Sequence, residues 1–329
     1  MNRKIVLAIA ALVLALGAAT VGGAYFGFVR AVAEPGPLKN PVTVIIAPRS
    51  GLSAIAKQLA DAGVVARPWM ATLEARRSGQ DRALKPGEYR FAPHVSLTDA
   101  LTKIVKHDVV PRFVTIPEGR VTADVHAILT SAEGLTGEIT SVVRDGDLLP
   151  ETYRYEWGDM RESLIARMHS ARIATLKELW DARQEGLPLK SPEEALVLAS
   201  IVEKETGVAA ERARVAGVFI NRLKRGMKLQ SDPTVVYGLA QTGEMDGPLT
   251  LADLAQPTPF NTYVIPGLPP SPICHPGRAA LAAVLHPEAT DALYFVADGT
   301  GGHAFAATLD EHNRNVARWR RIERQNRAR

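Results

Sequence analysis

The sequence has one cysteine, Cys274, and its eight histidines never fall in the HExxH spacing. A lone thiol excludes an internal disulfide and a thiolate metal cluster, so core packing must stabilise the fold, and we expect Cys274 to be buried and inert. The missing histidine spacing excludes the commonest signature of zinc hydrolases. No repeat of fixed period is visible, which argues against a solenoid. We therefore expect neither a metal nor an organic cofactor.

Charge is missing from residues 5–29, a run of 25 residues that follows Arg3 and Lys4. As a helix, such a run can cross a hydrocarbon core of about 30 Å. We predict that residues 1–30 form a cytoplasmic N-terminus and a single transmembrane helix in the inner (cytoplasmic) membrane, with the rest of the chain outside the cytoplasm. A cleaved signal peptide is the alternative, because Ala-Val-Ala at 31–33 resembles a cleavage site, but signal cores are shorter than this run.

Net positive charge is confined to the C-terminal end of the sequence. Residues 312–329 hold seven arginines and one glutamate, a net +6, so the formal charge of +4 leaves −2 for residues 1–311. A solvated terminal helix explains this pattern, and so does attraction to anionic lipid or to an acidic partner. Nucleic acid is not an expected partner of an exported protein.

Length and apolar content indicate a globular α+β protein: 329 residues, 46% of them hydrophobic, suffice for two compact domains. We expect a linker at 31–40, a small α+β domain at 41–110 and a larger α+β catalytic domain at 111–329. Strands are predicted at 42–47, 87–91, 109–116, 293–296 and 303–305. Helices are predicted at 53–62, 68–77, 97–106, 122–132, 160–185, 192–205, 209–225 and 310–321.

The segment from Gly226 to Arg278 is rich in proline and glycine and predicts a long loop region. Loops of this length are uncommon inside compact domains and are usually functional. Its polar side chains suit the hydroxyls and amides of sugars, and its aromatic side chains suit their faces.

The helical run ALVLASIVEKET at 195–206 carries no charge before Glu203, Lys204 and Glu205. At about 100° per residue the two glutamates point roughly 200° apart, so at most one is expected to face a given cleft. A carboxyl held against apolar side chains has a raised pKa, which suits a general acid near neutral pH. A buried helix that ends in solvated charges explains the same pattern.

An exported domain with a candidate acid points to cell-wall glycan, and two mechanisms remain open. Glycosidases use two carboxylates, and the second could be Glu205, Asp232, Asp246 or Asp253. A single carboxyl suffices if it protonates the glycosidic oxygen and then takes a proton from the 6-hydroxyl of the sugar, which attacks C1 to leave a 1,6-anhydro ring. The residues alone do not choose between the two.

Ten short segments carry a likeness to a known family. They are GEY at 87–89, IPEG at 116–119, LPETY at 149–153, LASIVEKET at 198–206, VFINRL at 218–223, MKLQSDPTV at 227–235, NTY at 261–263, GLPP at 267–270, LYFV at 293–296 and HAF at 303–305. In this order they resemble the endolytic murein transglycosylases of the MltG (YceG-like) family. Pro259-Phe260 and His275-Pro276 depart from its usual pattern, which bears on fine substrate contacts.

The resemblance implies a LysM-like small domain and a lytic transglycosylase that cuts peptidoglycan strands internally. It cleaves the MurNAc–GlcNAc bond to leave 1,6-anhydro-MurNAc ends, which terminates or trims nascent strands. The expected partners are peptidoglycan strands and the membrane, with peptidoglycan synthases as further candidates. A lysozyme-type hydrolase and a non-catalytic wall-binding scaffold remain as alternatives.

The resemblance also implies site residues. The family's catalytic glutamate is the first of the two in IVEKE at 201–205, hence Glu203, and we expect Glu205 to be a supporting carboxylate. His303 is expected to be structural. Residues near the substrate are expected to include Gln230, Ser231, Asp232, Asn261 and Tyr263, although turn formation and packing would explain these residues without a ligand.

Overall fold

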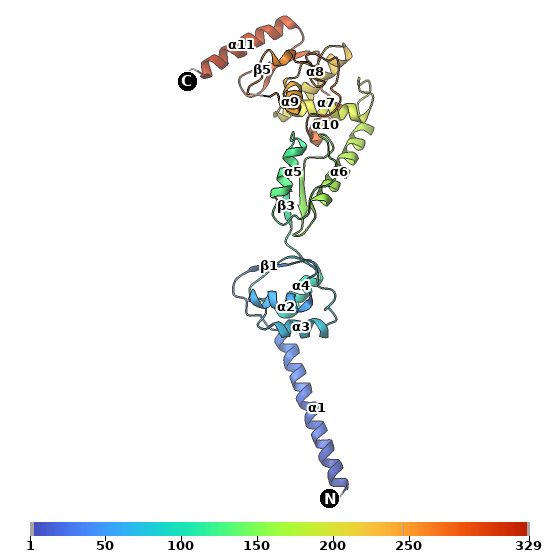
Figure 1. Ribbon diagram of the computed structural model, residues 1–329, viewed down its shortest axis with the longest axis vertical. Coiled ribbons are helices and arrows are strands. Elements are labelled where there is room, and N and C mark those ends of the chain that lie inside the picture. The colour runs from blue at the N-terminus through green and yellow to red at the C-terminus, as the bar shows by residue number, and fades with distance from the viewer. Residues whose placement is uncertain (1–2, 246, 328–329) are drawn as a thin grey trace. The chain divides into compact units, whose positions relative to one another are not determined.

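The computed structural model describes residues 3–245 and 247–327, which form two compact units. The first unit contains the chain up to Arg112 together with Glu133–Leu135 and Arg154–Asp159. The second contains Phe113–Ala132, Thr136–Tyr153 and the chain from Met160 onward. Both units combine helices with short strands (Figure 1), which confirms the predicted α+β class.

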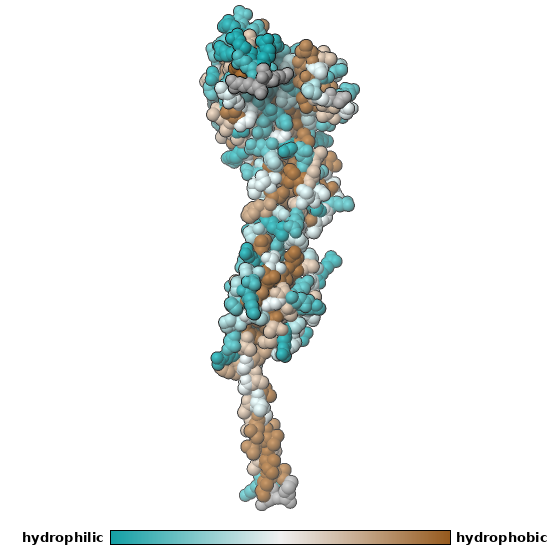
Figure 2. All heavy atoms as spheres, turned by 90° about the vertical axis from the view of Figure 1, so that its left-hand side faces the viewer, coloured by the Kyte–Doolittle hydropathy of each residue, from teal (hydrophilic) through white to brown (hydrophobic). Residues whose placement is uncertain are grey.

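The first element, α1 (Arg3–Ala33), is one continuous helix whose middle carries no charge. It is long and apolar enough to cross a membrane, and none of its most apolar stretch is buried within the protein. Figure 2 shows hydrophobic side chains over its surface. Because so large an apolar surface is unfavourable in water, the helix fits a single membrane anchor.

The rest of the first unit is built on a two-stranded antiparallel sheet. Strand β1 (Val42–Ile46) pairs with β2 (Gly87–Phe91), so that Val42 lies opposite Phe91 and Ile46 opposite Gly87. Three helices complete the unit: α2 (Leu52–Asp61), α3 (Pro68–Arg77) and α4 (Leu97–Val105).

The helices of this unit begin and pack as their sequences predict. Ser96 caps α4, because its Oγ accepts a hydrogen bond from the Asp99 amide at 3.1 Å. The core includes the buried side chains of Ile46, Leu59, Tyr89, Phe91, Leu101 and Ile104. The likeness of this unit to a LysM domain stays a prediction.

The second unit starts at Phe113, within strand β3 (Arg112–Thr115), which pairs with β4 (Thr152–Tyr155). Between them lies α5 (Thr122–Ser131), and after them comes the long helix α6 (Arg161–Asp181). The strand predicted at 109–116 is shorter than expected and is limited to Arg112–Thr115.

Helix α7 (Pro192–Glu205) lies at the centre of the second unit. It packs against α6, α8 (Arg212–Lys224), α9 (Asp232–Thr242) and α10 (Arg278–Leu285). Its residues from Ala195 to Val202 are all buried. Pro192 in the first turn and the Ser191 cap start the helix, and its last residue is Glu205, which is followed by an extended Thr206. The fully buried part of α7 thus ends at Val202, directly before the charged residues Glu203, Lys204 and Glu205.

The prediction of an uninterrupted loop over 226–278 is wrong at residues 232–242. These residues form α9, which starts with Pro233 in its first turn and ends at Gly243 in the left-handed conformation, with φ 74°. Its proline was taken as a loop signal, whereas proline also suits the first turn of a helix, where the missing N–H costs no hydrogen bond.

The chain finishes with a hairpin and a helix. Strands β5 (Tyr294–Ala297) and β6 (His303–Ala306) pair antiparallel, with Phe295 opposite Phe305. Helix α11 (Leu309–Arg327) packs against both strands and extends beyond the predicted end at 321. The hairpin lies against the core that contains α7, because Phe295 and Phe305 pack against that core.

Candidate functional site

Glu203 and Glu205 leave the end of α7 toward different cavities. Glu205 lines a cavity of about 340 Å³, and Glu203 lines a separate one of about 320 Å³. This separation follows from the two-residue spacing on a helix, which turns the side chains to nearly opposite faces. The structure therefore assigns each carboxyl its own surroundings.

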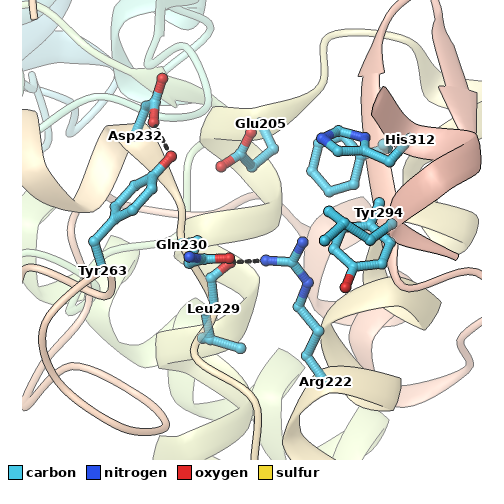
Figure 3. Close-up of a pocket in the computed structure, with 10 residues that line it drawn as sticks. Glu205, Arg222, Leu229, Gln230, Asp232, Tyr263, Tyr294 and His312 are labelled. Atoms are coloured by element: carbon cyan, nitrogen blue, oxygen red, sulfur yellow. Dashed lines mark hydrogen bonds between the residues drawn. The ribbon is translucent and has the colours of Figure 1, made fainter. Parts of the chain in front are cut away.

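The Glu205 cavity, which we call the Glu205 pocket, gathers polar and aromatic side chains from α7, α8, α9, β5, α11 and the connecting loops (Figure 3). Its lining residues are Glu205, Arg222, Leu229, Gln230, Asp232, Tyr263, Tyr294, Phe295, Leu309 and His312. Three residues predicted to lie near the substrate, Gln230, Asp232 and Tyr263, thus lie with Glu205.

Glu205 is a partly buried carboxyl with a strongly raised pKa. Burial and, to a smaller extent, the charge of nearby Asp232 raise the pKa, a hydrogen bond from Ser231 lowers it, and the net value is about 7. Ser231 Oγ donates to Glu205 Oε1 at 2.5 Å, and Ser231 itself is buried. A carboxyl with these properties can hold a proton at neutral pH and release it to a substrate.

Asp232 and Tyr263 form a pair on another wall of the pocket. The Tyr263 hydroxyl donates to Asp232 Oδ1 at 2.6 Å (Figure 3). Burial and Asp232 both raise the pKa of Tyr263, so its hydroxyl stays protonated and keeps donating. Gln230, two residues before Asp232, has a left-handed backbone with φ 50°, an unfavourable conformation for a residue with a side chain. Such backbone strain is found preferentially at functional sites.

Arg222, Tyr294 and His312 line the pocket but were not predicted. The ring of Tyr294 stacks on His312 with 5.1 Å between ring centroids. The Arg222 guanidinium lies over the Tyr294 ring at 5.3 Å from its centroid. Arg222 and Tyr294 lie within segments that carry the family likeness, and this likeness could have marked them as candidate site residues. His312 lies outside those segments.

Glu203 has a different environment from Glu205. Its Oε2 accepts a hydrogen bond from the Gly277 amide at 2.8 Å, and its Oε1 is 3.9 Å from Arg212 Nη2. Burial raises the pKa of Glu203 and the charge of Glu118 adds to the effect, against the opposing hydrogen bond from Gly277. The cavity beside it is lined by both acidic and basic side chains, among them Glu118 and Lys204.

Asp253 and Asn261 do not line the Glu205 pocket. Asn261 is fully buried, and its side-chain amide donates to the carbonyls of Leu254 and Gln256 at 3.1 and 2.7 Å. Asp253 accepts hydrogen bonds from Thr250 within its own turn. Asp246 lies outside the described residues. Asn261 therefore shapes the loop that carries Tyr263, whose amide donates to Asn261 Oδ1.

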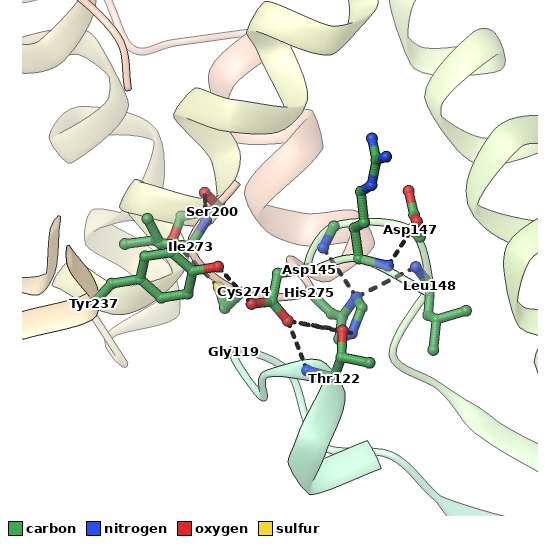
Figure 4. A network of polar contacts seen from close by, with 12 residues as sticks. Gly119, Thr122, Asp145, Asp147, Leu148, Ser200, Tyr237, Ile273, Cys274 and His275 are labelled. Atoms are coloured by element: carbon green, nitrogen blue, oxygen red, sulfur yellow. Dashed lines mark hydrogen bonds and ion pairs between the residues drawn. The ribbon is translucent and has the colours of Figure 1, made fainter. Parts of the chain in front are cut away.

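His275 belongs to a buried polar network rather than to a cavity (Figure 4). Its Nδ1 accepts from the Gly146 and Leu148 amides at 3.1 and 3.3 Å, so Nε2 carries the proton and faces Thr122 Oγ1 at 3.2 Å. Thr122 in turn donates to Asp145 at 2.8 Å. Burial lowers the pKa of His275 to about 4, so the ring is neutral.

Cys274 and His303 are both held by neighbouring residues. Cys274 is buried, as predicted, and its Sγ lies 3.3 Å from the Ser200 carbonyl oxygen. Burial raises the pKa of the Cys274 thiol, which therefore stays protonated and unreactive. His303 Nδ1 lies 2.7 Å from Glu211 Oε2. Among the described residues, no group of three or more His, Cys, Asp or Glu side chains is arranged to hold a metal ion.

Comparison with known proteins identifies relatives along most of the chain. A Bacillus subtilis (strain 168) protein named endolytic murein transglycosylase is 36% identical over 170 residues, which are 52% of this chain and 46% of that protein. A Streptococcus pneumoniae (serotype 2, strain D39 / NCTC 7466) protein of the same name is 30% identical over 348 residues, which cover 90% of this chain and 62% of that protein. The chain thus spans less than two thirds of the length of either relative.

A crystal structure of a yceG-like protein from Listeria monocytogenes has a similar fold. Its TM-score is 0.52 at 29% sequence identity, and the match covers 84% of this chain and 98% of that one. The YceG-like family matches residues 44–318, which include all of strand β2 and every residue of the Glu205 pocket. Because this match covers most of the sequence, the chain belongs to the YceG-like family.

Proposed function

We propose that this protein is an endolytic lytic transglycosylase that cleaves peptidoglycan strands between MurNAc and GlcNAc. Two relatives named endolytic murein transglycosylase support the substrate and the reaction class. The observation that carries the proposal is the Glu205 pocket, in which a carboxyl with a pKa near neutrality meets polar and aromatic side chains suited to a sugar.

We propose Glu205 as the general acid and base, in place of the Glu203 expected from the family resemblance. Glu205 shares its pocket with Gln230, Asp232 and Tyr263, whereas Glu203 lines another cavity and accepts a hydrogen bond from the Gly277 amide. Glu203 remains the second candidate because its pKa is also raised by burial. Glutamine variants at both positions separate the two assignments.

In the first step, the protonated Glu205 donates its proton to the glycosidic oxygen. The bond between C1 of MurNAc and that oxygen breaks, positive charge develops at C1, and the GlcNAc unit leaves as an alcohol. The Ser231 hydroxyl stabilises the carboxylate that Glu205 becomes, because it donates to Oε1. With a pKa of about 7, Glu205 is protonated in a substantial fraction of molecules near neutral pH and can therefore act as the acid.

In the second step, the Glu205 carboxylate removes the proton from the 6-hydroxyl of the same MurNAc. The bond between O6 and C1 forms, which closes the 1,6-anhydro ring and restores protonated Glu205. No water is consumed, and one carboxyl serves both steps. The apolar side chains of Leu229 and Phe295 in the lining favour the exclusion of water from the reacting centre.

A hydrolase that uses Asp232 as its second carboxylate is the alternative, since Asp232 lines the same pocket. Its Oδ1 accepts a hydrogen bond from Tyr263, which holds the carboxylate in place. In a hydrolase, such a carboxylate would activate a water molecule, and the product would carry a reducing end. The product itself therefore distinguishes the two reactions.

The test digests purified peptidoglycan with the full-length protein in detergent micelles and analyses the products by mass spectrometry. We expect wild type to release fragments with anhydro ends, each lighter by one water than a hydrolysed fragment. Glu205→Gln should lower the rate by about 100-fold or more, the typical scale of general acid–base catalysis. Glu203→Gln, the matched control two residues away, should retain activity within about tenfold.

Other outcomes contradict specific parts of the proposal. Fragments with reducing ends would establish hydrolysis. An inactive Glu203→Gln variant beside an active Glu205→Gln variant would return the catalytic role to Glu203. Absence of cleavage by wild type, with retained binding to peptidoglycan in a pull-down, would favour a wall-binding scaffold.

We also propose that α1 anchors the protein in the inner membrane, with its N-terminus in the cytoplasm and residues 111–329 as a catalytic domain outside. Arg3 and Lys4 before the apolar run support this orientation. Residues 31–40 would then be a linker and 41–110 a LysM-like domain, and peptidoglycan synthases are candidate partners. Protease added to intact spheroplasts should degrade the exported part, and its survival there would contradict this topology.

A further inference from the structure

Arg222 is a buried cation in the Glu205 pocket. Its relative exposure is 7%, yet among the described residues no carboxylate forms an ion pair with it. Two backbone carbonyls hold it instead: Nε donates to Leu293 at 2.7 Å and Nη1 to Leu229 at 2.6 Å. Burying a charge without an opposite charge beside it is unfavourable, so the presence of Arg222 beside Glu205 calls for a partner.

The remaining terminal nitrogen of Arg222 is directed at the space where a substrate would bind. In Figure 3, the nitrogen that is not bonded to Leu229 points between Glu205 and His312. Because Nε and Nη1 are fixed by carbonyls of two different loops, the planar guanidinium cannot rotate away. Arg222 therefore offers a donor of defined direction to the pocket.

The neighbouring groups leave this donor free. Asp232 belongs to another wall, where Tyr263 donates to it at 2.6 Å. His312, stacked on Tyr294, has an Nδ1 that is buried without a hydrogen-bond partner. Burial and the charge of Arg222 lower the pKa of His312, so this ring stays neutral. Glu205 is the carboxyl that interacts electrostatically with Arg222. In the proposed reaction Glu205 starts protonated, so it carries no negative charge to pair with Arg222 at that stage.

We propose that Arg222 is a specificity-determining residue whose Nη2 binds an amide carbonyl oxygen of the glycan. The inference rests on the proposed function, because it takes the Glu205 pocket to be the place where the strand is cut. An amide carbonyl is the strongest neutral acceptor that an N-acylated amino sugar carries. Two sources exist in a peptidoglycan strand: the acetamido group on the sugar ring and the amide that joins the lactyl group to the stem peptide.

The test compares Arg222→Lys with wild type on three kinds of glycan strand, using the full-length protein in micelles. The first strands are intact, the second have lost their stem peptides to an amidase, and the third have been de-N-acetylated. We expect Arg222→Lys to raise KM about tenfold on intact strands, the effect of losing one oriented hydrogen bond to a charged donor. That penalty should disappear only on the strands that lack the amide that Arg222 binds.

The pattern of penalties also identifies the source. A penalty that vanishes on amidase-treated strands assigns the lactyl amide, and one that vanishes on de-N-acetylated strands assigns the acetamido group. An equal penalty on all three strands overturns the proposal, since it leaves Arg222 with a purely structural role. Arg225→Lys, an exposed position after α8, is the matched control and should leave all three KM values unchanged.

A binding measurement covers the case in which Arg222→Lys does not fold. Glu205→Gln protein with Arg222 intact is titrated with the same three strands by calorimetry. If intact strands bind about tenfold more tightly than one of the two treated kinds of strand, the result supports the proposal. Equal affinity for all three kinds of strand overturns it. This measurement needs no cleavage. It therefore tests whether Arg222 binds an amide carbonyl independently of whether the protein catalyses the proposed transglycosylase reaction.

Discussion

The hydroxyl of Ser231 donates a hydrogen bond to the carboxyl of Glu205, with 2.5 Å between Oγ and Oε1. The two residues come from different segments, Glu205 from the last turn of α7 and Ser231 from the residue before α9. Ser231 is itself fixed, because its amide donates to Thr262 Oγ1 at 2.9 Å. The start of α9 thereby sets both the direction and the proton affinity of the proposed catalytic carboxyl.

Removing this hydroxyl should change the pH dependence of the reaction. The hydrogen bond from Ser231 lowers the pKa of Glu205, so Ser231→Ala should raise that pKa and move the alkaline limb of kcat/KM to higher pH by about one unit. The maximal rate should fall about tenfold, because the carboxyl loses its orientation. A pH–rate profile measures both effects, and Ser231→Thr, which keeps the hydroxyl, should restore the wild-type profile. An unshifted alkaline limb in Ser231→Ala would show that another group controls it.

Glu205 should cost the protein stability at neutral and alkaline pH. Its pKa is about 7 in the folded protein against a reference value of 4.5, so the folded state holds the proton more tightly than the unfolded state. Any stability linked to this proton is complete below pH 4.5 and is lost as pH rises through 7. Relative to wild type, Glu205→Gln should therefore gain about 1–3 kcal/mol in the free energy of unfolding between pH 4 and pH 8.

Urea unfolding of both proteins across this pH range measures the gain. Glu185→Gln, which removes an exposed carboxyl, is the control and should run parallel to wild type. A constant difference between Glu205→Gln and wild type from pH 4 to pH 8 would mean that the pKa of Glu205 is not raised in the folded protein.

Most elements of the fold could be predicted because their signals are local. Ser96 as a helix cap, the charge-free run of α1 and the apolar spacing of α4 each depend on neighbouring residues only. Helix α9 was missed because its first turn contains Pro233, and proline marks both loops and helix starts. Whether a proline begins a helix or a loop depends on whether the residues after it can pack against another element. The residues of α9 pack against α7.

The site was harder to predict because its decisive contacts are distant in sequence. A helical turn places Glu203 and Glu205 on opposite faces, but residues from Ala195 to Val202 are buried on all sides, so no exposed face marks the cleft. Arg222 resembles an ordinary surface charge of an amphipathic helix. Its burial depends on the Leu293 carbonyl, 71 residues away, which no local pattern reports.

Gly146 should be essential for stability, because it combines a left-handed backbone with close packing. Its φ is +89°, and a Cβ there would lie 2.5 Å from Cγ of Pro272, a rigid side chain. Gly146→Ala should therefore lose about 2–4 kcal/mol of unfolding free energy. Gly226→Ala, with φ +66° and nothing within 4 Å of a Cβ, is the matched control and should lose only about 1 kcal/mol. Thermal or urea unfolding gives both values, and equal losses would show that Pro272 moves aside.

His275 should make the protein sensitive to mild acid. The ring is buried and neutral, with a folded pKa of about 4 against a reference value of 6.5. The stability that this depressed pKa contributes is complete above pH 6.5 and is lost as the pH falls toward 4, because only the unfolded state takes up the proton. His275→Asn retains a side-chain acceptor for the Gly146 or Leu148 amide but cannot titrate. It should be less stable than wild type at pH 7.5, and this deficit should shrink by about 2–3 kcal/mol by pH 4. Urea unfolding at pH 4, 5, 6.5 and 7.5 measures the deficit, and a deficit that stays constant over this range would show that His275 is protonated within the folded network.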